Sequence, residues 1–583
     1  MRISASLFLL GFGQLAFSAL FKWDVTWVDA APDGFNRPVI GINGQWPCPP
    51  IEVEVGEQIT VVLTNKLGNE TTGLHFHGFS QRGTNQMDGP AGVTQCPIPP
   101  GSTFTYSFKA DSPGTYWYHS HNMGQFPDGL RGPLIVRDPN APYKSKISKE
   151  YTVTISDWYH DQMPNLLHTY QSTANTAGVE PVPWAGLIND KSTDTFEVTE
   201  GETYLFRIIN LGAFPSYFFG FEGHNMTIVE MDSVYTEETP CSTLYIGAAQ
   251  RYTVLVTANQ DASKNYGVVS VVDTTMFKQA SPNPNFSNMT LGTLSYNSAN
   301  PAVTPSAPVM PPIDDITVPP LDGAELLGPV TKSIALNFNF TKIDGIQRAI
   351  INDVTYLSQK VPSLYTALTV GKDNAKDSSV YGQVNPIIVE YGDIVEIVIN
   401  NYDNNGHPWH LHGHQFQTVA RSQGNVLPDS PYNQSEAEPV PMRRDVAGVR
   451  GNGWVALRFR ADNPGVQLLH CHIEWHVEAG LTATIIEAPD LLYGGTAPDG
   501  SVWNRLIVPP DHIAACRKQG MAYAGNAGGD TQNPTDTYGA LYKGSSGSGA
   551  KSESDLLEAE ALGVLGAILE MKKEHLFKRE ESM

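Results

Sequence analysis

Four short clusters of histidine constrain this chain more than any other feature. They are His75-Phe76-His77-Gly78, Trp117-Tyr118-His119-Ser120-His121, His407-Pro408-Trp409-His410-Leu411-His412-Gly413-His414 and His470-Cys471-His472-Ile473-Glu474-Trp475-His476. In an extended strand, a His-x-His pair puts two imidazoles on one face, roughly 6.5 to 7 Å apart along the backbone, which suits neighbouring metal ions. One such pair is weak evidence, because two solvated imidazoles explain it equally well. Four clusters together predict a metal site with several ions.

The fourth cluster also contains a thiol. Side chains alternate along a strand, so His470 and His472 point to one face and Cys471 to the other. A thiolate with two imidazoles is the ligand set of a blue copper site, and His476 lies five residues after Cys471. One strand would then serve two metal sites and give an electron a short covalent path between them. The alternative is a buried free cysteine between surface histidines, and the three other clusters argue against it.

These motifs resemble those of the multicopper oxidase family, most closely its fungal iron oxidases and laccases, from about residue 22 to about residue 490. The resemblance implies four copper ions, namely one type 1, one type 2 and two type 3. The type 1 ligands it implies are His407, Cys471 and His476, the type 2 ligands His75 and His410, and the type 3 ligands His77, His119, His121, His412, His470 and His472. The family's axial position falls on Leu481, which has no lone pair. A three-coordinate type 1 copper follows, and the missing axial ligand raises its potential.

Reduction of O₂ to water needs protons as well as electrons. The resemblance places the acids that deliver them at Asp88 and Glu474. Asp88 also fits a turn carboxylate ahead of Gly89. Glu474 lies between metal ligands and has no comparable alternative.

Length and composition favour several β-sandwiches. At 583 residues the chain is too long for one core, and its Gly 53, Pro 42 and short apolar runs are typical of strands divided by turns. We expect an all-β protein of three consecutive cupredoxin-like Greek-key β-sandwich domains at residues 20–140, 150–298 and 329–515. A stiff, extended Pro-rich linker is expected at residues 299–328. The middle domain lacks a His-x-His pair, so we expect a spacer without copper.

An internal repeat is also suggested, because the apolar stretches 61–65, 205–210 and 397–400 each end in asparagine.

The two ends of the chain predict secretion. Residues 1–18 are typical of a signal peptide, with Arg2, an apolar run at 7–12 and small residues near the expected cut. Residues 520–583 are expected to be a flexible tail with an amphipathic helix at 556–571, too short in its apolar part for the roughly 20 residues of a membrane span. Six glycosylation sequons fit an extracellular protein, at Asn69, Asn225, Asn285, Asn288, Asn339 and Asn433. We therefore expect a secreted monomer without a transmembrane span.

The net charge of -23 argues against a nucleic-acid partner, because no basic stripe is present to neutralise phosphates.

The five cysteines predict two disulfides. If Cys471 binds copper, four remain, and three pairings are possible. The resemblance to laccases favours Cys96 with Cys516, which leaves Cys48 with Cys241.

The electron donor must reach a type 1 histidine. The resemblance to iron oxidases extends to Glu180 and Asp403, and such hard oxygen ligands favour Fe³⁺ over Fe²⁺. A third acidic position of those enzymes falls on Lys278, a cation that would repel Fe²⁺. A solvated loop charge is the alternative for all three residues, and it is the one we expect for Lys278. Glu180 could instead accept the proton of a phenol, as in laccases.

Lys278 and the expected lack of a membrane anchor both count against iron. We therefore predict a laccase-like enzyme that couples oxidation of a small phenolic or aromatic substrate, such as a polyketide or pigment precursor, to reduction of O₂. Oxidation of Fe(II) to Fe(III) by a ferroxidase is the alternative. A non-catalytic copper-binding protein would explain the histidines but not a cysteine between type 3 ligands.

Overall fold

The computed structural model describes residues 18–304, 306, 308, 310–422 and 432–543. The predicted signal peptide, except for Ser18, lies outside the described residues, as does the amphipathic helix predicted at 556–571. In the part of the chain that the structure describes, no helix is long and apolar enough to cross a membrane.

The first group of strands comes from the N-terminal part of the chain. It contains β1 (Ser18–Ala30), β2 (Arg37–Ile42), β3 (Ile51–Glu54), β4 (Gln58–Asn65), β5 (His75–His77), β6 (Thr103–Lys109), β7 (Gly114–His119) and β8 (Arg131–Arg137). They form the sheets β2-β1-β4-β6 and β3-β8-β7-β5.

The second group follows directly. It contains β9 (Lys149–Trp158), β10 (Ala185–Ile188), β11 (Thr195–Glu197), β12 (Thr203–Asn210), β13 (Tyr217–Phe221), β14 (Met226–Met231), β15 (Val234–Cys241), β16 (Leu244–Ile246), β17 (Arg251–Thr257), β18 (Tyr266–Val272) and β19 (Met289–Ser295). Their sheets are β10-β9-β12-β17-β14-β15 and β11-β19-β18-β13-β16.

The third group carries the C-terminal histidine clusters. It contains β20 (Lys332–Ile343), β21 (Ile346–Ile351), β22 (Pro386–Val389), β23 (Ile394–Asn401), β24 (His407–Leu411), β25 (Phe416–Arg421), β26 (Arg443–Arg444), β27 (Val446–Val449), β28 (Trp454–Arg460), β29 (Gly465–Cys471) and β30 (Thr482–Glu487). Their sheets are β21-β20-β23-β28-β25-β26 and β22-β30-β29-β24-β27, and β31 (Gly495–Thr496) pairs separately with β32 (Val502–Trp503). The helices of the described chain are α1 (Met163–Tyr170), α2 (Ser363–Thr369), α3 (Glu474–Glu478) and α4 (Pro510–Lys518).

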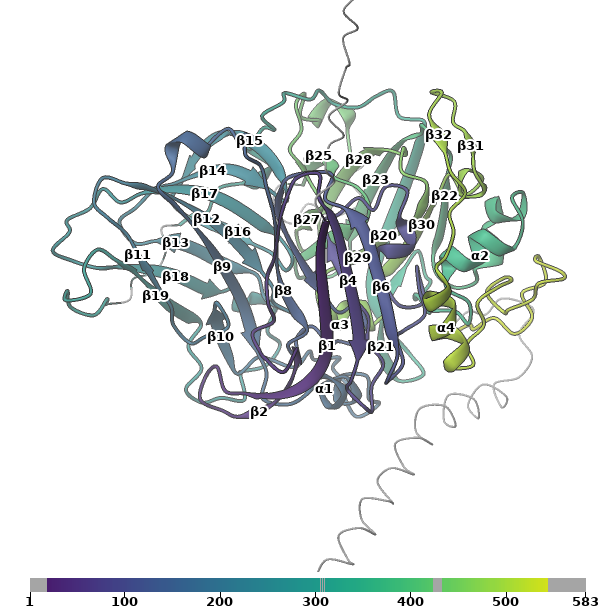
Figure 1. The fold of residues 1–583 in the computed structure, drawn as a ribbon, viewed down its shortest axis with the longest axis horizontal. Helices are drawn as coiled ribbons and strands as arrows, with labels where there is room; N and C mark the ends of the chain where they lie inside the picture. Colours follow the sequence, from purple (N-terminus) through teal and green to yellow (C-terminus); the bar gives the residue numbers. More distant parts are fainter. Residues whose placement is uncertain (1–17, 305, 307, 309, 423–431, 544–583) are drawn as a thin grey trace, which may run out of the picture. The chain divides into compact units, whose positions relative to one another are not determined.

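The described strands thus form three successive β-sandwiches, which confirms the predicted all-β class (Figure 1). β4 shows why the sequence folds this way. Its buried side chains Ile59, Val61 and Leu63 alternate with partly exposed ones, which is the two-residue period of a strand with one face on a core.

The suggested repeat is visible in the strand order. β4, β12 and β23 each pair in parallel with the first strand of their sandwich and antiparallel with β6, β17 and β28 respectively. Each ends in an asparagine whose Oδ1 accepts a hydrogen bond from the backbone N–H two residues later, in Asn65, Asn210 and Asn401. We expected the third strand to end at Asn400, and this prediction is wrong by one residue because β23 ends at Asn401. The corrected position matters because the turn at Asn401 binds the backbone of Asp403.

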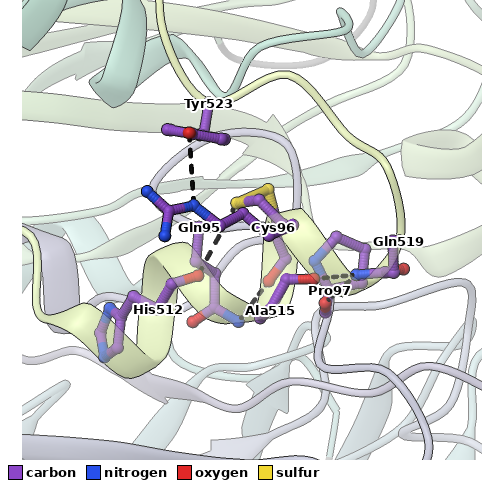
Figure 2. The surroundings of a disulfide bond; sticks show 9 residues. Gln95, Cys96, Pro97, His512, Ala515, Gln519 and Tyr523 are labelled. Atoms are coloured by element: carbon purple, nitrogen blue, oxygen red, sulfur yellow. Dashed lines mark hydrogen bonds between the residues drawn. A yellow bond between two sulfur atoms is a disulfide. The ribbon is translucent and has the colours of Figure 1, made fainter.

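The predicted disulfide between Cys96 and Cys516 is confirmed, with Cα atoms 5.3 Å apart. Figure 2 shows that it ties the segment around Cys96 to α4. The side-chain amide of Gln519 donates to the backbone oxygen of Pro97 at 2.5 Å and adds a second link. A disulfide of this kind indicates an oxidising compartment.

The predicted pairing of Cys48 with Cys241 is wrong, because both are free. Cys48 is buried in the core of the first sandwich, where its thiol donates to the backbone oxygen of Gly129 at 3.4 Å. Cys241 ends β15 and packs against the core of the second sandwich. The two thiols belong to different cores, and cysteine number alone carries no such geometry.

The Pro-rich segment is packed against its neighbours rather than extended through solvent. Its short 3₁₀ turn η4 (Asp315–Thr317) includes the buried Asp315, which pairs with Arg444 of β26 at 2.6 Å. Val318 is fully buried in the core of the second sandwich. Buried contacts, and not proline stiffness alone, therefore fix this segment.

Candidate metal centres

The first and the third sandwich each bring two of the histidine motifs onto neighbouring strands. β5 pairs antiparallel with β7, so that His75 lies opposite His119. β24 pairs antiparallel with β29, so that His410 lies opposite His470. All these strands are buried, which places the histidines inside the molecule.

Eight histidines from the first and third sandwiches meet in one group, which we name the histidine cluster: His75, His77, His119, His121, His410, His412, His470 and His472. The His75 and His412 rings stack with centroids 4.0 Å apart, and the His77 and His410 rings with centroids 3.8 Å apart. Potential ligand atoms lie within 4.8 Å of one another in three sets, namely His75-His77-His119, His75-His410-His412 and His121-His412-His470. The predicted ligands from the two ends of the chain, His75 to His121 and His410 to His472, are thus brought together.

The ring nitrogens are arranged as metal ligands require. Nδ1 of His75, His119 and His410 lies 2.8 to 2.9 Å from a backbone oxygen, of Asp88, Ser120 and Asp445 respectively. In His77 the order is reversed, because Nε2 faces Asp445 and Nδ1 is left. The remaining nitrogen of each of these four rings is buried without a hydrogen-bond partner among the described residues. Such lone pairs, aimed at one another, fit bound metal ions.

The electrostatics agree with this fit. Burial lowers the pKa of most members of the cluster well below the usual histidine value, as in His77, His119, His121, His410, His412 and His472. The pKa of His470 is lowered to about 4 for the same reason. The lowered pKa values favour the neutral form of these seven imidazoles, which is the form that binds metal, and several nitrogen donors suit copper.

A second, separate group contains the cysteine. Cys471 Sγ lies 3.6 Å from Nδ1 of His407 and 3.5 Å from Nδ1 of His476, and the two Nδ1 atoms are 3.0 Å apart. All three side chains are buried. This is a thiolate with two imidazoles converging on one point, the donor set of a mononuclear copper site.

The surroundings of this group are apolar. The Phe338 ring lies 5.0 Å from the His407 ring, and the Phe340 ring lies 4.9 Å from the His476 ring. Leu481, the predicted axial residue, is fully buried in the same hydrophobic core as Cys471. Burial raises the pKa of the Cys471 thiol, so loss of its proton depends on a metal ion.

Asp88 directly follows η1 (Asn85–Met87) and is 1% exposed. Its carboxylate Oδ2 accepts a hydrogen bond from Nδ1 of His412 at 2.8 Å, and its backbone oxygen binds Nδ1 of His75. Asp88 is thus a turn carboxylate ahead of Gly89 that also contacts two members of the histidine cluster.

Glu474 begins α3, two residues after His472. Burial raises its pKa well above the usual carboxyl value, and the neighbouring Glu478 raises it further, against a hydrogen bond from the Gly124 backbone. Burial and the neighbouring Glu478 thus both favour the protonated form of Glu474.

The two predicted donor-side carboxylates each lie against a histidine of the cysteine group. Oδ2 of Asp403 is 3.1 Å from Nε2 of His407, and Oε1 of Glu180 is 3.5 Å from Nε2 of His476. Burial acts to raise the pKa of both carboxyl groups, but the histidine contacts, joined at Glu180 by the charge of Lys278, outweigh it. The pKa of Asp403 falls to about 2, and that of Glu180 falls below its usual value. Both are therefore carboxylates at neutral pH.

Lys278 is an exposed loop residue, as expected, but it also pairs with Glu180. Its ammonium donates to Oε1 of Glu180 at 3.1 Å and to the backbone oxygen of Gly178 at 3.2 Å, with the side chain 37% exposed. Oε2 of Glu180 is buried and has no hydrogen-bond partner among the described residues. One oxygen of this carboxylate thus binds a cation, while the other is left for a further ligand.

Asp445 is a site residue that the sequence reasoning missed. It contacts His77 through its carboxylate and His410 through its backbone oxygen. Nothing in the run Arg443-Arg444-Asp445 has metal-ligand spacing, so no local signal marks it. The contact depends on residues 368 positions apart.

Family models described as multicopper oxidase match residues 24–141, 149–299 and 356–491 of this chain. Among similar curated proteins, the iron transport multicopper oxidase FET3 of Gibberella zeae is 45% identical over 92% of this chain and 85% of its own length. The protein of the same name from Saccharomyces cerevisiae is 38% identical over 91% of this chain and 85% of its length.

Solved structures agree. The crystal structure of Fet3p, described as a multicopper oxidase that functions in iron import, is 38% identical and aligns with a TM-score of 0.83 over 89% of this chain and 98% of that one. The laccase from Botrytis aclada is 28% identical and aligns with a TM-score of 0.74 over 86% and 91% of the two chains. With its metal-ligand geometry, matched domains and relatives taken together, this chain belongs to the multicopper oxidase family.

Proposed function

We propose that this protein is a ferroxidase, which takes electrons from Fe(II) and passes them to O₂ through four copper ions. The type 1 ligands are His407, Cys471 and His476, the type 2 ligands are His75 and His410, and the type 3 ligands are His77, His119, His121, His412, His470 and His472. Copper bound at these positions supplies storage and transfer of the four electrons that reduction of O₂ to two waters requires. The iron-oxidising alternative thus replaces the phenol oxidase as our first choice.

The observation that carries this proposal is the pair of carboxylates on the type 1 histidines. Asp403 on His407 and Glu180 on His476 are ionised, and their oxygens are hard ligands for iron. Because carboxylates bind Fe³⁺ more strongly than Fe²⁺, they favour loss of an electron at the edge of a copper ligand. The relatives with iron transport in their names support the same choice.

The chain's own acids serve the reduction of O₂. Each O₂ consumes four protons, and the buried cluster keeps bulk water at a distance. Glu474, whose protonated form is favoured by burial, is the proton donor beside His472 in the sequence. Asp88, whose carboxylate accepts a hydrogen bond from Nδ1 of His412, orients this ligand and is the second acid of the proton path. The Cys96–Cys516 disulfide further supports action outside the cytosol, as expected for a secreted protein.

Steady-state kinetics with Fe(II) and with a panel of phenols and naphthols test the proposal directly. We expect the specificity constant for Fe(II) to exceed that for every phenol. An enzyme that oxidises phenols far better than Fe(II) would return the assignment to the laccase-like alternative.

Removal of either carboxylate should impair iron oxidation selectively. Loss of a contact to a charged group costs about 1.5 to 3 kcal/mol, so Glu180→Ala and Asp403→Ala should each lower kcat/KM for Fe(II) about tenfold to a hundredfold. The blue absorption and the oxidation of hydroquinone should change much less.

Glu237→Ala is the matched control, because Glu237 is an exposed carboxylate of β15 with the same charge. Equal losses for Fe(II) and hydroquinone in Glu180→Ala would indicate a damaged type 1 site and contradict an iron-binding role.

We expect Lys278 to slow the oxidation of Fe(II). When Fe²⁺ binds Glu180, the partly exposed ion pair between Lys278 and Glu180 must break. Such an ion pair stabilises a protein by up to about 1 kcal/mol. Lys278→Met should therefore raise kcat/KM for Fe(II) up to about fivefold, and Lys278→Asp, which adds a ligand, should raise it about tenfold. Stopped-flow reduction of the type 1 copper by Fe(II) measures the effect. An unchanged or lower rate in both variants would show that Lys278 does not compete with the substrate.

A further inference from the structure

We propose that the middle sandwich, which carries no copper ligand, supplies a positioning residue for the histidine cluster, namely Arg251. The inference rests on the proposed copper ligands. The ligand motifs lie in the first and third sandwiches, and the inference adds a role for the second sandwich in positioning the ligands.

Arg251 is the first residue of β17 and is fully buried. Its Nη1 and Nη2 donate to the two carboxylate oxygens of Asp445 at 2.6 and 2.7 Å. Its Nε donates to the backbone oxygen of Thr115 at 3.0 Å, and the carboxylate of Asp232 binds its backbone N–H at 2.8 Å. The first sandwich thus holds the guanidinium of Arg251 and the second holds its backbone, in the position where the side chain contacts Asp445 of the third.

Asp445 transmits this position to two ligands. Its Oδ1, already bound by Arg251, lies 3.2 Å from Nε2 of His77, while its backbone oxygen accepts from Nδ1 of His410 at 2.9 Å. An acceptor at Nε2 keeps the His77 proton there and leaves the lone pair on the buried Nδ1. The two-point contact with Arg251 therefore decides which His77 nitrogen faces the metal and in which direction.

The glycine that ends the first histidine motif makes room for this pair. Gly78 has φ +92, and a Cβ atom there would lie 2.6 Å from Nη2 of Arg251 and 3.0 Å from Oδ2 of Asp445. Both the left-handed backbone and the absent side chain are needed at this position. The absence of a side chain at Gly78 thus allows the Arg251–Asp445 pair to pack directly against the His75-Phe76-His77-Gly78 motif.

The middle sandwich also offers a matched control in Arg207 of β12. Arg207 is 3% exposed, pairs with Glu150 at 2.7 Å and donates to Oγ1 of Thr115 at 2.8 Å. It resembles Arg251 in burial and in its contact with the first sandwich. None of its hydrogen bonds or ion pairs found among the described residues involves a histidine of the cluster.

The test compares Arg251→Lys with Arg207→Lys in the copper-loaded enzyme. Lysine keeps the charge but cannot bind both oxygens of Asp445. Loss of a residue that orients a metal ligand typically costs 10–100-fold in metal affinity. In Arg251→Lys we therefore expect cluster copper to be removed by a chelator at about tenfold to hundredfold lower concentration, with an altered type 2 EPR signal and an unchanged blue absorption.

Arg207→Lys should retain copper and EPR signals like the unmodified enzyme. Two results would overturn the inference: equal copper retention in the two variants, or simultaneous loss of blue and cluster copper in Arg251→Lys, which would indicate general unfolding. Copper content and blue absorption of the unmodified enzyme report separately on the proposed ligands, so failure of that assignment is distinguishable.

Discussion

Cys471→Ser should abolish the blue absorption of the purified enzyme while the fold is kept. The colour of such a site comes from the bond between copper and a thiolate, and Cys471 is the thiol that lies within 3.6 Å of both His407 and His476. Fe(II) oxidation should fall to background, because the electron path from the donor side to His470 and His472 runs through this residue.

The fold should survive because the substitution only replaces one sulfur atom by an oxygen atom. A buried hydroxyl without a good partner costs about 1 to 3 kcal/mol, against a typical stability of about 5 to 15 kcal/mol. Circular dichroism and thermal unfolding check this, and absorption spectroscopy checks the colour. Cys48→Ser is the control, since Cys48 is also buried and free but lies in the core of the first sandwich. A Cys471→Ser protein that stays blue would end the type 1 assignment.

His410→Ala should stop O₂ reduction while the type 1 copper still accepts electrons. Nε2 of His410 is buried without a partner among the described residues and faces the cluster, whereas the cysteine group uses His407. Even outer partners of metal ligands contribute 10–100-fold, so removal of a ligand should lower O₂ consumption at least about a hundredfold.

The expected signature is a blue protein that Fe(II) bleaches and that air does not re-oxidise. EPR should show the loss of the type 2 signal, and an oxygen electrode measures turnover. His414→Gln is the control from the same motif. His414 pairs with Glu487 at 2.6 Å, and glutamine keeps a donor toward that carboxylate. O₂ consumption by His410→Ala at the unmodified rate would show that the ligand roles are assigned incorrectly.

The histidine motifs could be recognised as candidate metal ligands from sequence because the geometry of a strand is local, and the family resemblance then implied the role of each ligand. A His-x-His pair on a strand faces one way, and the order His470-Cys471-His472 sends the thiol the other way, whatever surrounds the strand. The buried face of β4 follows from the same two-residue period. Family resemblance then supplied the folding back that brings β5 and β7 to β24 and β29.

The exact end of β23 and the turn that follows it were predicted only approximately from sequence. The backbone N–H of Asp403 binds Oδ1 of Asn401 at 2.8 Å, and this turn presents the Asp403 carboxylate to His407. The repeat was recognised, but the strand end was placed one residue early. Strand ends depend on where ladder bonds stop, and pattern alone does not show this.

By itself, then, the sequence determined the three-sandwich class and the resemblance to the family, and this resemblance implied the eleven candidate copper ligands and the Cys96–Cys516 disulfide. Only the tertiary structure decided that Cys48 and Cys241 stay apart and that Lys278 binds Glu180. It alone also showed that Arg251 holds Asp445 against His77. The physical reason is distance along the chain: Arg251 and Asp445 are 194 residues apart, and Lys278 and Glu180 are 98 apart. Periodicity reports which face a side chain takes, whereas a charge partner is chosen by packing between domains.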